Sequence, residues 1–231
     1  MSDESNFNER KEQLIAYYKN AGYIDSQEAI RAFLTVPREE FIGSNPKHLA
    51  YVDRPLPIYE NQTISAPHMV AMMISQNILD LHISDICLEV GGGSGYHAAV
   101  IAEMVAPTNS DKMKWGHVYS IERLGKLVKF AEENLKRTKY DNRVTVIEGD
   151  GSLGLPDKAP FDKITVACAA PGIPPPLIEQ LKPGGRLVIP VASASQYYQE
   201  LKVIIKRKDG SLKSETKGGV AFVPLIGKYG Y

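Results

Sequence analysis

The chain has 231 residues, of which 43% are hydrophobic, and its 27 Lys and Arg residues balance its 27 Asp and Glu residues. The length suits one α/β domain with an N-terminal elaboration, although two domains remain possible. The zero net charge disfavours nucleic acid or an anionic membrane as partner, because long-range attraction to either needs a basic surplus.

The two cysteines, Cys87 and Cys168, lie in apolar runs, so we expect two buried thiols, no disulfide framework and no metal site. The polar N-terminus lacks the apolar core of a signal peptide, and no apolar stretch approaches the roughly 20 residues of a membrane helix. We therefore expect a cytoplasmic protein.

The first 80 residues form an irregular region interrupted by prolines. We predict short helices over residues 9–18 and 27–34, the second opened by Asp25 and Glu28 in a capping-box arrangement. A short turn over 38–42 and a fixed loop over 45–58 follow, because three prolines exclude a long regular element there. Apolar residues then recur at helical spacing over 67–81, with Ser65 as the N-cap candidate.

From residue 86 onward, short β-branched runs alternate with helical patterns. The predicted strands are 86–90, 118–121, 144–148, 163–168 and 186–191, and the predicted helices are 96–105, 125–137 and 176–181. Strands separated by helices require crossover connections, so we predict a doubly wound, mostly parallel sheet of the Rossmann-like type, with residues 107–116 as an exposed loop.

The C-terminal part changes character. Residues 199–206 and 219–225 are strand-like and flank Asp209-Gly210, a hairpin signal, so we predict antiparallel edge strands. Within one domain, we expect a helical and loop elaboration on the substrate side at 1–80, a cofactor-binding core at 81–195 and C-terminal strands at 196–231.

The first predicted strand runs into a glycine-rich turn that opens a helix. Counting from Gly91 gives Gly93 and Gly95, a G-x-G-x-G spacing, with Glu89 two residues ahead and Tyr96 where a dinucleotide fingerprint would need its third glycine. This pattern resembles the first motif of S-adenosylmethionine-dependent methyltransferases, although glycine turns also occur for structural reasons.

Carboxylates also end the next two predicted strands. Glu122 is placed to accept the ribose hydroxyls of a nucleoside, and Asp150 to reach an adenine amino group. A solvated Glu at a helix start and an ordinary turn are the structural alternatives. Because the carboxyl ends of adjacent parallel strands meet in one crevice, we predict a cofactor site there that includes the neighbouring Arg123 and Gly151.

The N-terminal region is more specific. The runs YVDRPLPI at 51–58 and NQTISAPHM at 61–69, together with 169–174 and 220–225, closely resemble protein-L-isoaspartate O-methyltransferases from about Phe33 to Leu225. The resemblance implies methyl transfer from S-adenosyl-L-methionine, with S-adenosyl-L-homocysteine as product, to the free carboxylate of isoaspartyl residues in damaged proteins and peptides. The methyl ester then closes to a succinimide, which starts repair. A carboxylate is already ionised at neutral pH, so this reaction needs no general base.

The same resemblance implies roles for individual residues. Ser65 matches the active-site serine, and it could also cap the following helix. The positions matching the family near the cofactor are Gln62, Thr63, Ile64 and His68, and those matching the segment that pairs with the peptide backbone are Ala221, Phe222 and Val223. His68 could equally be a satisfied histidine of the first helical turn.

Three positions depart from the family pattern: Asn61 replaces a common glycine, Gly92 stands where Thr or Ser is frequent, and Ala221 replaces a larger residue. The alternatives left open are a methyltransferase for another carboxylate or a small metabolite, and a module that binds cofactor without turnover. A nicotinamide-dependent dehydrogenase is disfavoured by the glycine spacing. The oligomeric state does not follow from the sequence.

Overall fold

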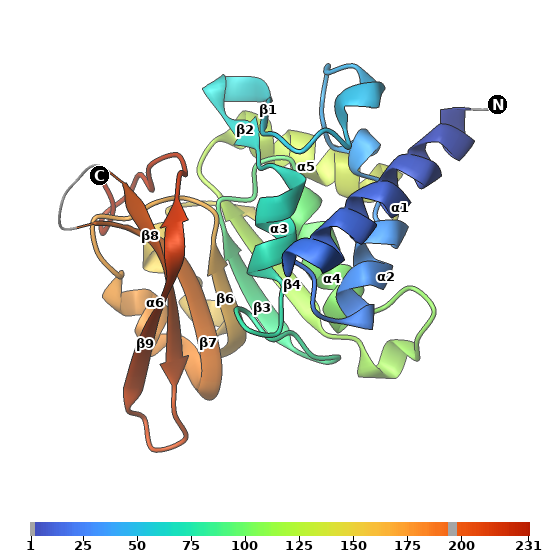
Figure 1. Cartoon of the computed structure of the whole chain (residues 1–231). Helices are drawn as coiled ribbons and strands as arrows, with labels where there is room; N and C mark the ends of the chain where they lie inside the picture. The colour runs from blue at the N-terminus through green and yellow to red at the C-terminus, as the bar shows by residue number, and fades with distance from the viewer. Residues whose placement is uncertain (1–2, 194–197) are drawn as a thin grey trace.

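The computed structural model describes residues 3–193 and 198–231, and a seven-stranded sheet forms its centre (Figure 1). The strands are β3 (Ile86–Val90), β4 (His117–Glu122), β5 (Val144–Glu148), β6 (Phe161–Val166), β7 (Leu181–Ala192), β8 (Gln199–Lys206) and β9 (Leu212–Val220). Their order is β5-β4-β3-β6-β7-β8-β9; the pairs from β5 to β7 are parallel, and β8 and β9 join antiparallel. The predicted fold class is confirmed.

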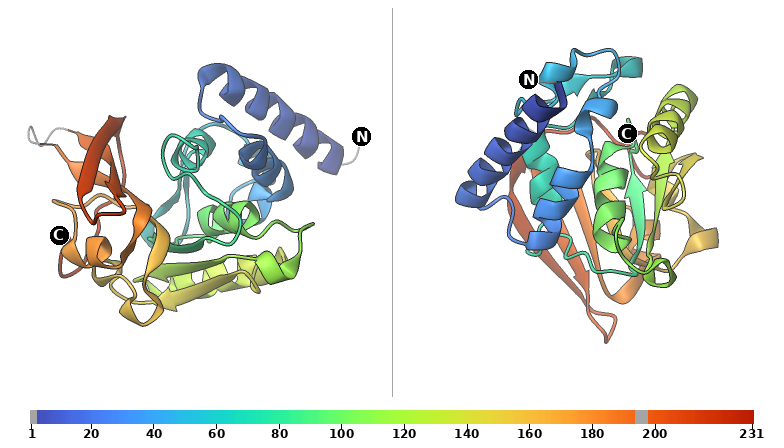
Figure 2. Two further views of the ribbon diagram at one scale, coloured as in Figure 1. Left: turned by 90° about the horizontal axis from the view of Figure 1, so that it is seen from below. Right: turned by 90° about the vertical axis from the view of Figure 1, so that its right-hand side faces the viewer.

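Six helices and a small hairpin surround this sheet in the described ranges. The helices are α1 (Asp3–Ala21), α2 (Gln27–Thr35), α3 (Pro67–Met73), α4 (Tyr96–Val105), α5 (Gly125–Arg137) and α6 (Pro175–Glu179), and β1 (Leu56–Pro57) pairs antiparallel with β2 (Thr63–Ile64). Figures 1 and 2 show α1 and α2 on the side of the molecule away from β8 and β9. None of the described helices is long and apolar enough to cross a membrane.

The core has two halves, one on each face of the sheet, because side chains alternate along a strand. On β3, Cys87 packs with apolar residues of the N-terminal helices and α4, whereas Leu88 and Val90 pack with Leu177 of α6. Both thiols, Cys87 and Cys168, are buried as predicted.

Several predicted elements agree with the structure residue for residue, namely β3, β5, β8, α4 and α5. Helix α1 extends well beyond the predicted 9–18 at both ends. The division into three parts stays a prediction, and its proposed boundary at 195–196 lies outside the described residues.

Helix α3 ends at Met73, so the prediction of a helix to residue 81 was wrong. Beyond it, the Asp25 carboxylate accepts hydrogen bonds from the main-chain amides of Gln76 (3.1 Å) and Asn77 (3.4 Å), and Asp80 takes a left-handed φ of 57°. Asp25 therefore does not cap α2, whose N-cap is Ser26. The apolar spacing over 67–81 reflected burial and not a continuous helix.

The last strand was also misplaced. β9 covers Leu212–Val220, whereas the prediction put a strand at 219–225. β9 is an edge strand with largely exposed Lys, Ser, Glu and Gly residues, so it carries no apolar alternation that would reveal it. After Val220, β-pairing within the described residues is limited to an isolated bridge between Ala169 and Pro224.

Candidate active site

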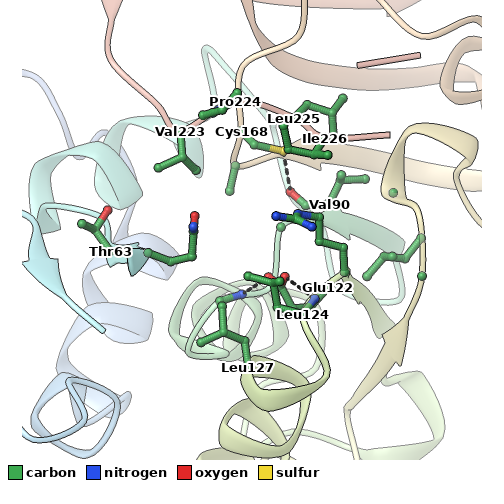
Figure 3. A pocket seen from close by; sticks show the side chains of 18 residues that line it. Thr63, Val90, Glu122, Leu124, Leu127, Cys168, Val223, Pro224, Leu225 and Ile226 are labelled. Carbon is green, nitrogen blue, oxygen red and sulfur yellow. Dashed lines mark hydrogen bonds between the residues drawn. The ribbon is translucent and has the colours of Figure 1, made fainter. Parts of the chain in front are cut away.

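The sheet changes direction of winding at β3, which pairs in parallel with β4 on one side and β6 on the other. Ligands of open α/β sheets bind at such a point, outside the carboxyl ends of the strands. A cavity lies there, with about 570 Å³ of space between its walls including its opening to solvent. Figure 3 shows Glu122 and Leu124 on one side of this cofactor cavity, with Val223, Pro224, Leu225 and Ile226 across from them.

The glycine loop uses its three predicted glycines in two ways. All three have left-handed φ angles: 92° at Gly91, 54° at Gly93 and 82° at Gly95. Gly91 and Gly93 line the cofactor cavity, so a ligand can approach their main chain. A Cβ on Gly95 would lie 3.3 Å from side-chain atoms of Ala131 and Leu135, so this glycine serves the packing of α4 against α5.

The departure at Gly92 has a local cause. A Cβ at this position would stand 2.5 Å from the hydroxyl oxygen of Ser120 on β4. Ser120 is buried and donates a hydrogen bond to the Glu89 carboxylate. The space that a Thr or Ser would need is thus taken by the serine of the neighbouring strand.

Glu122 lines the cofactor cavity at the end of β4 and is 7% exposed. Its Oε2 accepts a hydrogen bond from the amide of Gly93 and its Oε1 one from the amide of Leu124, both at 3.0 Å. An ionised carboxylate has about four acceptor sites, so capacity remains for two ligand hydroxyls. Glu122 therefore shapes the glycine loop as well as facing the cavity, in which Arg123 also lies.

Asp150 is held by the chain itself. Its Oδ1 accepts hydrogen bonds from the Ser152 amide (2.9 Å) and hydroxyl (2.7 Å), and its Oδ2 one from the Lys228 amide (2.8 Å). Burial alone would raise the pKa of Asp150, but these hydrogen bonds outweigh it and lower the pKa. Gly151, and not Asp150, is among the residues lining the cofactor cavity.

Glu89 lies behind the glycine loop, fully buried. Its Oε1 is 3.1 Å from Nδ1 of His97, a residue that the sequence analysis did not single out. His97 lines a small cavity next to the glycine loop, and its buried Nε2 has no hydrogen-bond partner among the described residues. A buried polar atom of this kind calls for a polar partner, which the amino-acid end of S-adenosylmethionine would supply.

The cavities also fit the rest of that cofactor. The Glu122 carboxylate can accept from two hydroxyls such as those of a ribose, and apolar side chains suited to a flat ring line the remaining wall, namely Ile121, Leu127, Leu225 and Ile226. Cys168 also borders the cofactor cavity, and burial raises the pKa of its thiol to about 12, so it is a neutral apolar wall.

A second, open cleft, with about 1,370 Å³ of space including its wide opening to solvent, adjoins the cofactor cavity. We call it the substrate cleft; it is lined by Pro55, Thr63, Ser65, Ala66, His68, Met69, Ala167, Tyr198 and residues 219–223. Thr63 and Ala167 line this cleft, the cofactor cavity and the small cavity at the glycine loop. The three spaces therefore meet at these two residues.

Ser65 stands at this junction, lining both the substrate cleft and the small cavity. The prediction that it caps α3 was wrong: the N-cap is Ala66, and no side chain caps that helix. Instead, the guanidinium of the fully buried Arg38 donates to the Ser65 carbonyl oxygen at 2.7 Å and to that of Ala50 at 2.8 Å. No described residue bonds the Ser65 hydroxyl.

His68 lies on the substrate-cleft side of this junction and does not line the cofactor cavity. Its amide (3.0 Å) and its ring Nδ1 (2.9 Å) both contact Oδ1 of Asp53, which also accepts a bond from the Tyr18 hydroxyl at 2.8 Å. Burial would raise the pKa of Asp53, but these hydrogen bonds lower it.

The remaining predicted residues divide between the spaces. Gln62 lines the cofactor cavity, and the buried Ile64 lines the small cavity. Ala221, Phe222 and Val223 border the substrate cleft, and Val223 also reaches the cofactor cavity. The structure thus brings the N-terminal and C-terminal motifs together across one cleft.

Comparison with known proteins shows the family of the chain. A family model described as protein-L-isoaspartate(D-aspartate) O-methyltransferase matches residues 9–230. The protein-L-isoaspartate O-methyltransferase of Hyperthermus butylicus is 53% identical over 99% of this chain and 93% of its own length, and that of Pyrococcus horikoshii 51% identical over 100% and 99%.

Solved structures agree. A protein-L-isoaspartate O-methyltransferase structure is 31% identical, with a TM-score of 0.82 over 95% of this chain and 67% of the other. A beta-aspartate methyltransferase from Plasmodium falciparum, crystallised in complex with S-adenosyl-L-homocysteine, is 28% identical, with a TM-score of 0.80 over 93% of this chain and 97% of the other.

The doubly wound sheet, the glycine loop and the carboxylate at the end of β4 are those of an S-adenosylmethionine-dependent methyltransferase. Within that class, the chain belongs to the protein-L-isoaspartate(D-aspartate) O-methyltransferase family.

Three residues at or behind the site were missed by the sequence analysis: Arg38, His97 and Ser120. Each of these residues contacts a partner on another segment, so no short sequence motif indicates its role. Gly92 was the one indirect signal, because an unexpected glycine in the loop indicates a neighbour that needs its space.

Proposed function

We propose that this chain methylates the free α-carboxylate of L-isoaspartyl residues in proteins and peptides, with Ser65 as the residue that receives that carboxylate. The observation that carries the proposal is the place of Ser65, where the open substrate cleft meets the spaces at the glycine loop. A hydroxyl at this point can hold a carboxylate in line with a methyl donor on the other side.

S-adenosylmethionine supplies an electrophilic methyl group on a sulfonium. A carboxylate oxygen forms the new bond to the methyl carbon as the carbon–sulfur bond breaks, and the electron pair of that bond stays on the sulfur of S-adenosylhomocysteine. The attacking carboxylate is already ionised, so no residue needs to remove a proton. The protein contributes position and the exclusion of water, effects worth roughly 7–11 kcal/mol in well-oriented systems.

The residues around Ser65 fit this positioning role. Arg38 fixes the Ser65 main chain from the buried side, which leaves the hydroxyl to donate to the substrate carboxylate. On the same side of the cleft, Asp53 fixes the His68 ring through Nδ1. The imidazole therefore presents its other nitrogen, Nε2, as the group available for a substrate atom.

On the cofactor side, we assign the ribose hydroxyls of the cofactor to Glu122. The cofactor can approach the main chain closely at Gly91 and Gly93. We assign its amino-acid end to His97, which Glu89 contacts from behind. The wall of the cofactor cavity is completed by Gln62, Thr63, Arg123 and Gly151. Asp150 supports this wall indirectly, because it holds Ser152 and the C-terminal segment at Lys228.

The size and openness of the substrate cleft favour a polypeptide over a small metabolite. Its wall includes residues 219–223, which end β9 and continue beyond it, and such an edge suits a peptide that pairs through backbone hydrogen bonds. Such pairing explains how one enzyme can accept damaged sites in many sequences, because main-chain bonds do not depend on side chains.

The decisive experiment uses two peptides that differ only in one linkage. Transfer of radiolabelled methyl from S-adenosylmethionine is expected to the isoaspartyl peptide and not to its normal aspartyl twin. Equal labelling of both peptides would overturn the proposal, and labelling of neither in the presence of bound cofactor would favour a binding module.

A further inference from the structure

The segment that follows β9 has its main chain held from one side by a side chain. Oε1 of Gln199 accepts a hydrogen bond from the amide of Phe222 at 2.6 Å, and Nε2 of Gln199 donates one to the carbonyl oxygen of Phe222 at 2.9 Å. In an antiparallel ladder, a residue exchanges both bonds with one residue of the next strand. The Gln199 carboxamide therefore takes the place of a strand beside Phe222.

The opposite side of this segment is left available. Along an extended chain, the main-chain groups of successive residues point to alternate sides. With Phe222 directed at Gln199, the groups of Ala221 and Val223 point the other way, where the Val223 carbonyl accepts from the Ala169 amide at 2.8 Å. In the part of the chain that the structure describes, the N–H and C=O of Ala221 and the N–H of Val223 have no hydrogen-bond partner.

These groups border the cleft that faces Ser65. Ala221 and Val223 both line it, and Ala167, two residues before Ala169, lines it as well. We propose that Gln199 is a positioning residue for the peptide substrate: its carboxamide locks the register of residues 221–223, so that this edge can pair with the substrate main chain. The proposal rests on the proposed function and specifies how the substrate is read.

The pairing has a defined consequence for the substrate. The Ala221 carbonyl can accept from one substrate N–H, and the amides of Ala221 and Val223 can donate to substrate carbonyls. One position of the peptide must therefore carry an N–H, and a proline or an N-methyl group there removes that bond and adds bulk. Side chains at the other positions are read weakly.

The first test replaces Gln199 by methionine, which has similar length but cannot form either bond. Losing two main-chain bonds of ordinary strength is expected to raise the KM for an isoaspartyl peptide about tenfold. The dissociation constant of S-adenosylhomocysteine should stay within about twofold of the wild-type value, because the change removes only the contact of Gln199 to residues 221–223. Gln199→Glu keeps the acceptor for the Phe222 amide and should give a smaller rise in KM.

The chain offers a matched control in Gln180. Its Oε1 accepts from the Leu155 amide at 2.7 Å, and its Nε2 donates to the Leu153 carbonyl oxygen at 2.8 Å, the same two-bond clamp on a loop away from the substrate cleft. Gln180→Met should lower the Tm without raising the KM for the peptide. If Gln199→Met lowers the Tm in the same way and leaves the KM unchanged, its role is structural and the proposal is overturned.

A second measurement uses the wild-type protein, so it does not depend on a folded variant. Isoaspartyl peptides N-methylated at one backbone position at a time should show one position where the KM rises about tenfold. In Gln199→Met the penalty at that position should shrink to less than about threefold, because both changes disturb the same pairing. A scan without any sensitive position overturns the proposal while leaving methyl transfer intact; a wild-type protein that does not label the unmodified isoaspartyl peptide overturns the proposed function and this inference with it.

Discussion

The two sides of the site are built in different ways. On the cofactor side, the loops leave adjacent strands of one sheet, and Glu122 holds Gly93 across 29 positions of sequence. On the substrate side, Ser65 is held by Arg38 from 27 positions earlier, and His68 by Asp53 and Tyr18. Both sides depend on contacts between segments far apart in the sequence. On the cofactor side the parallel strands bring these segments together, whereas the substrate side is held by N-terminal segments outside the sheet.

The largest expected effect tests the cofactor side. Glu122→Ala removes the carboxylate that we assign to the ribose and also its bonds to the Gly93 and Leu124 amides. Charge-assisted hydrogen bonds are worth about 1.5–3 kcal/mol each, so the dissociation constant of S-adenosylhomocysteine should rise at least about a hundredfold in calorimetry. The control is Glu148→Ala, one strand away at the paired position on β5, which does not line the cofactor cavity and should leave the affinity unchanged. Equal losses in both variants would contradict the ribose assignment.

A smaller, more selective effect is expected at Ser65. Ser65→Ala should lower kcat/KM for an isoaspartyl peptide about 10–100-fold, the value of a hydrogen bond to a charged group, with cofactor affinity unchanged. Because Ala66 is the N-cap of α3, the Tm should not fall. Ser26 provides the contrast: it caps α2 through the Ala29 amide, and Ser26→Ala should cost about 1 kcal/mol of stability without a kinetic effect. A loss of stability without a kinetic change in Ser65→Ala would assign it a structural role.

The helices show which features could be predicted from the sequence and which depend on tertiary contacts. Helices α4 and α5 agree with the prediction because each covers one continuous run of helical spacing between two strands. The extension predicted for α3 failed because residues beyond Met73 are buried by tertiary contacts, with Asp25 taking the amides that a helix would use. An apolar pattern reports burial, and only continuous main-chain bonding makes it a helix.

The site shows the same limit. The glycine loop, Glu122 and Gly151 were predicted from their position at strand ends, and they line one cavity. Ser65 was chosen by family resemblance and by its place before a predicted helix, and residues 221–223 by resemblance alone. Nothing in their spacing reveals that they face one cleft. Arg38 and Gln199 escaped both routes, because their bonds are to main-chain atoms of segments far along the chain.

Gly92 tests the contact between the glycine loop and the neighbouring strand β4 on the cofactor side. In Gly92→Ala the new Cβ would stand 2.5 Å from Oγ of Ser120, an overpacking that typically costs about 1–3 kcal/mol. Ser120→Ala removes that oxygen, so the double variant should be less destabilised in urea than the sum of the two single changes. Strict additivity would mean that Ser120 is not what excludes a side chain at position 92.

The smallest effect is expected at Asn61, in the hairpin that leads to Ser65. Asn61 has a φ of 54°, and its neighbour Glu60 one of 59°, so this turn needs left-handed backbone at two successive residues. Asn tolerates that conformation better than most residues, which explains how it can stand where the family commonly has glycine.

Asn61→Gly gains conformational freedom in the turn but also in the unfolded chain, so the free energy of unfolding should change by less than about 0.5 kcal/mol. Asn61→Ala should cost about 1 kcal/mol, because alanine has neither the glycine freedom nor the Asn side chain. Kinetics unaltered in Asn61→Gly would show that the turn serves Ser65 through backbone shape alone, whereas a changed KM would place the Asn61 side chain in contact with the substrate.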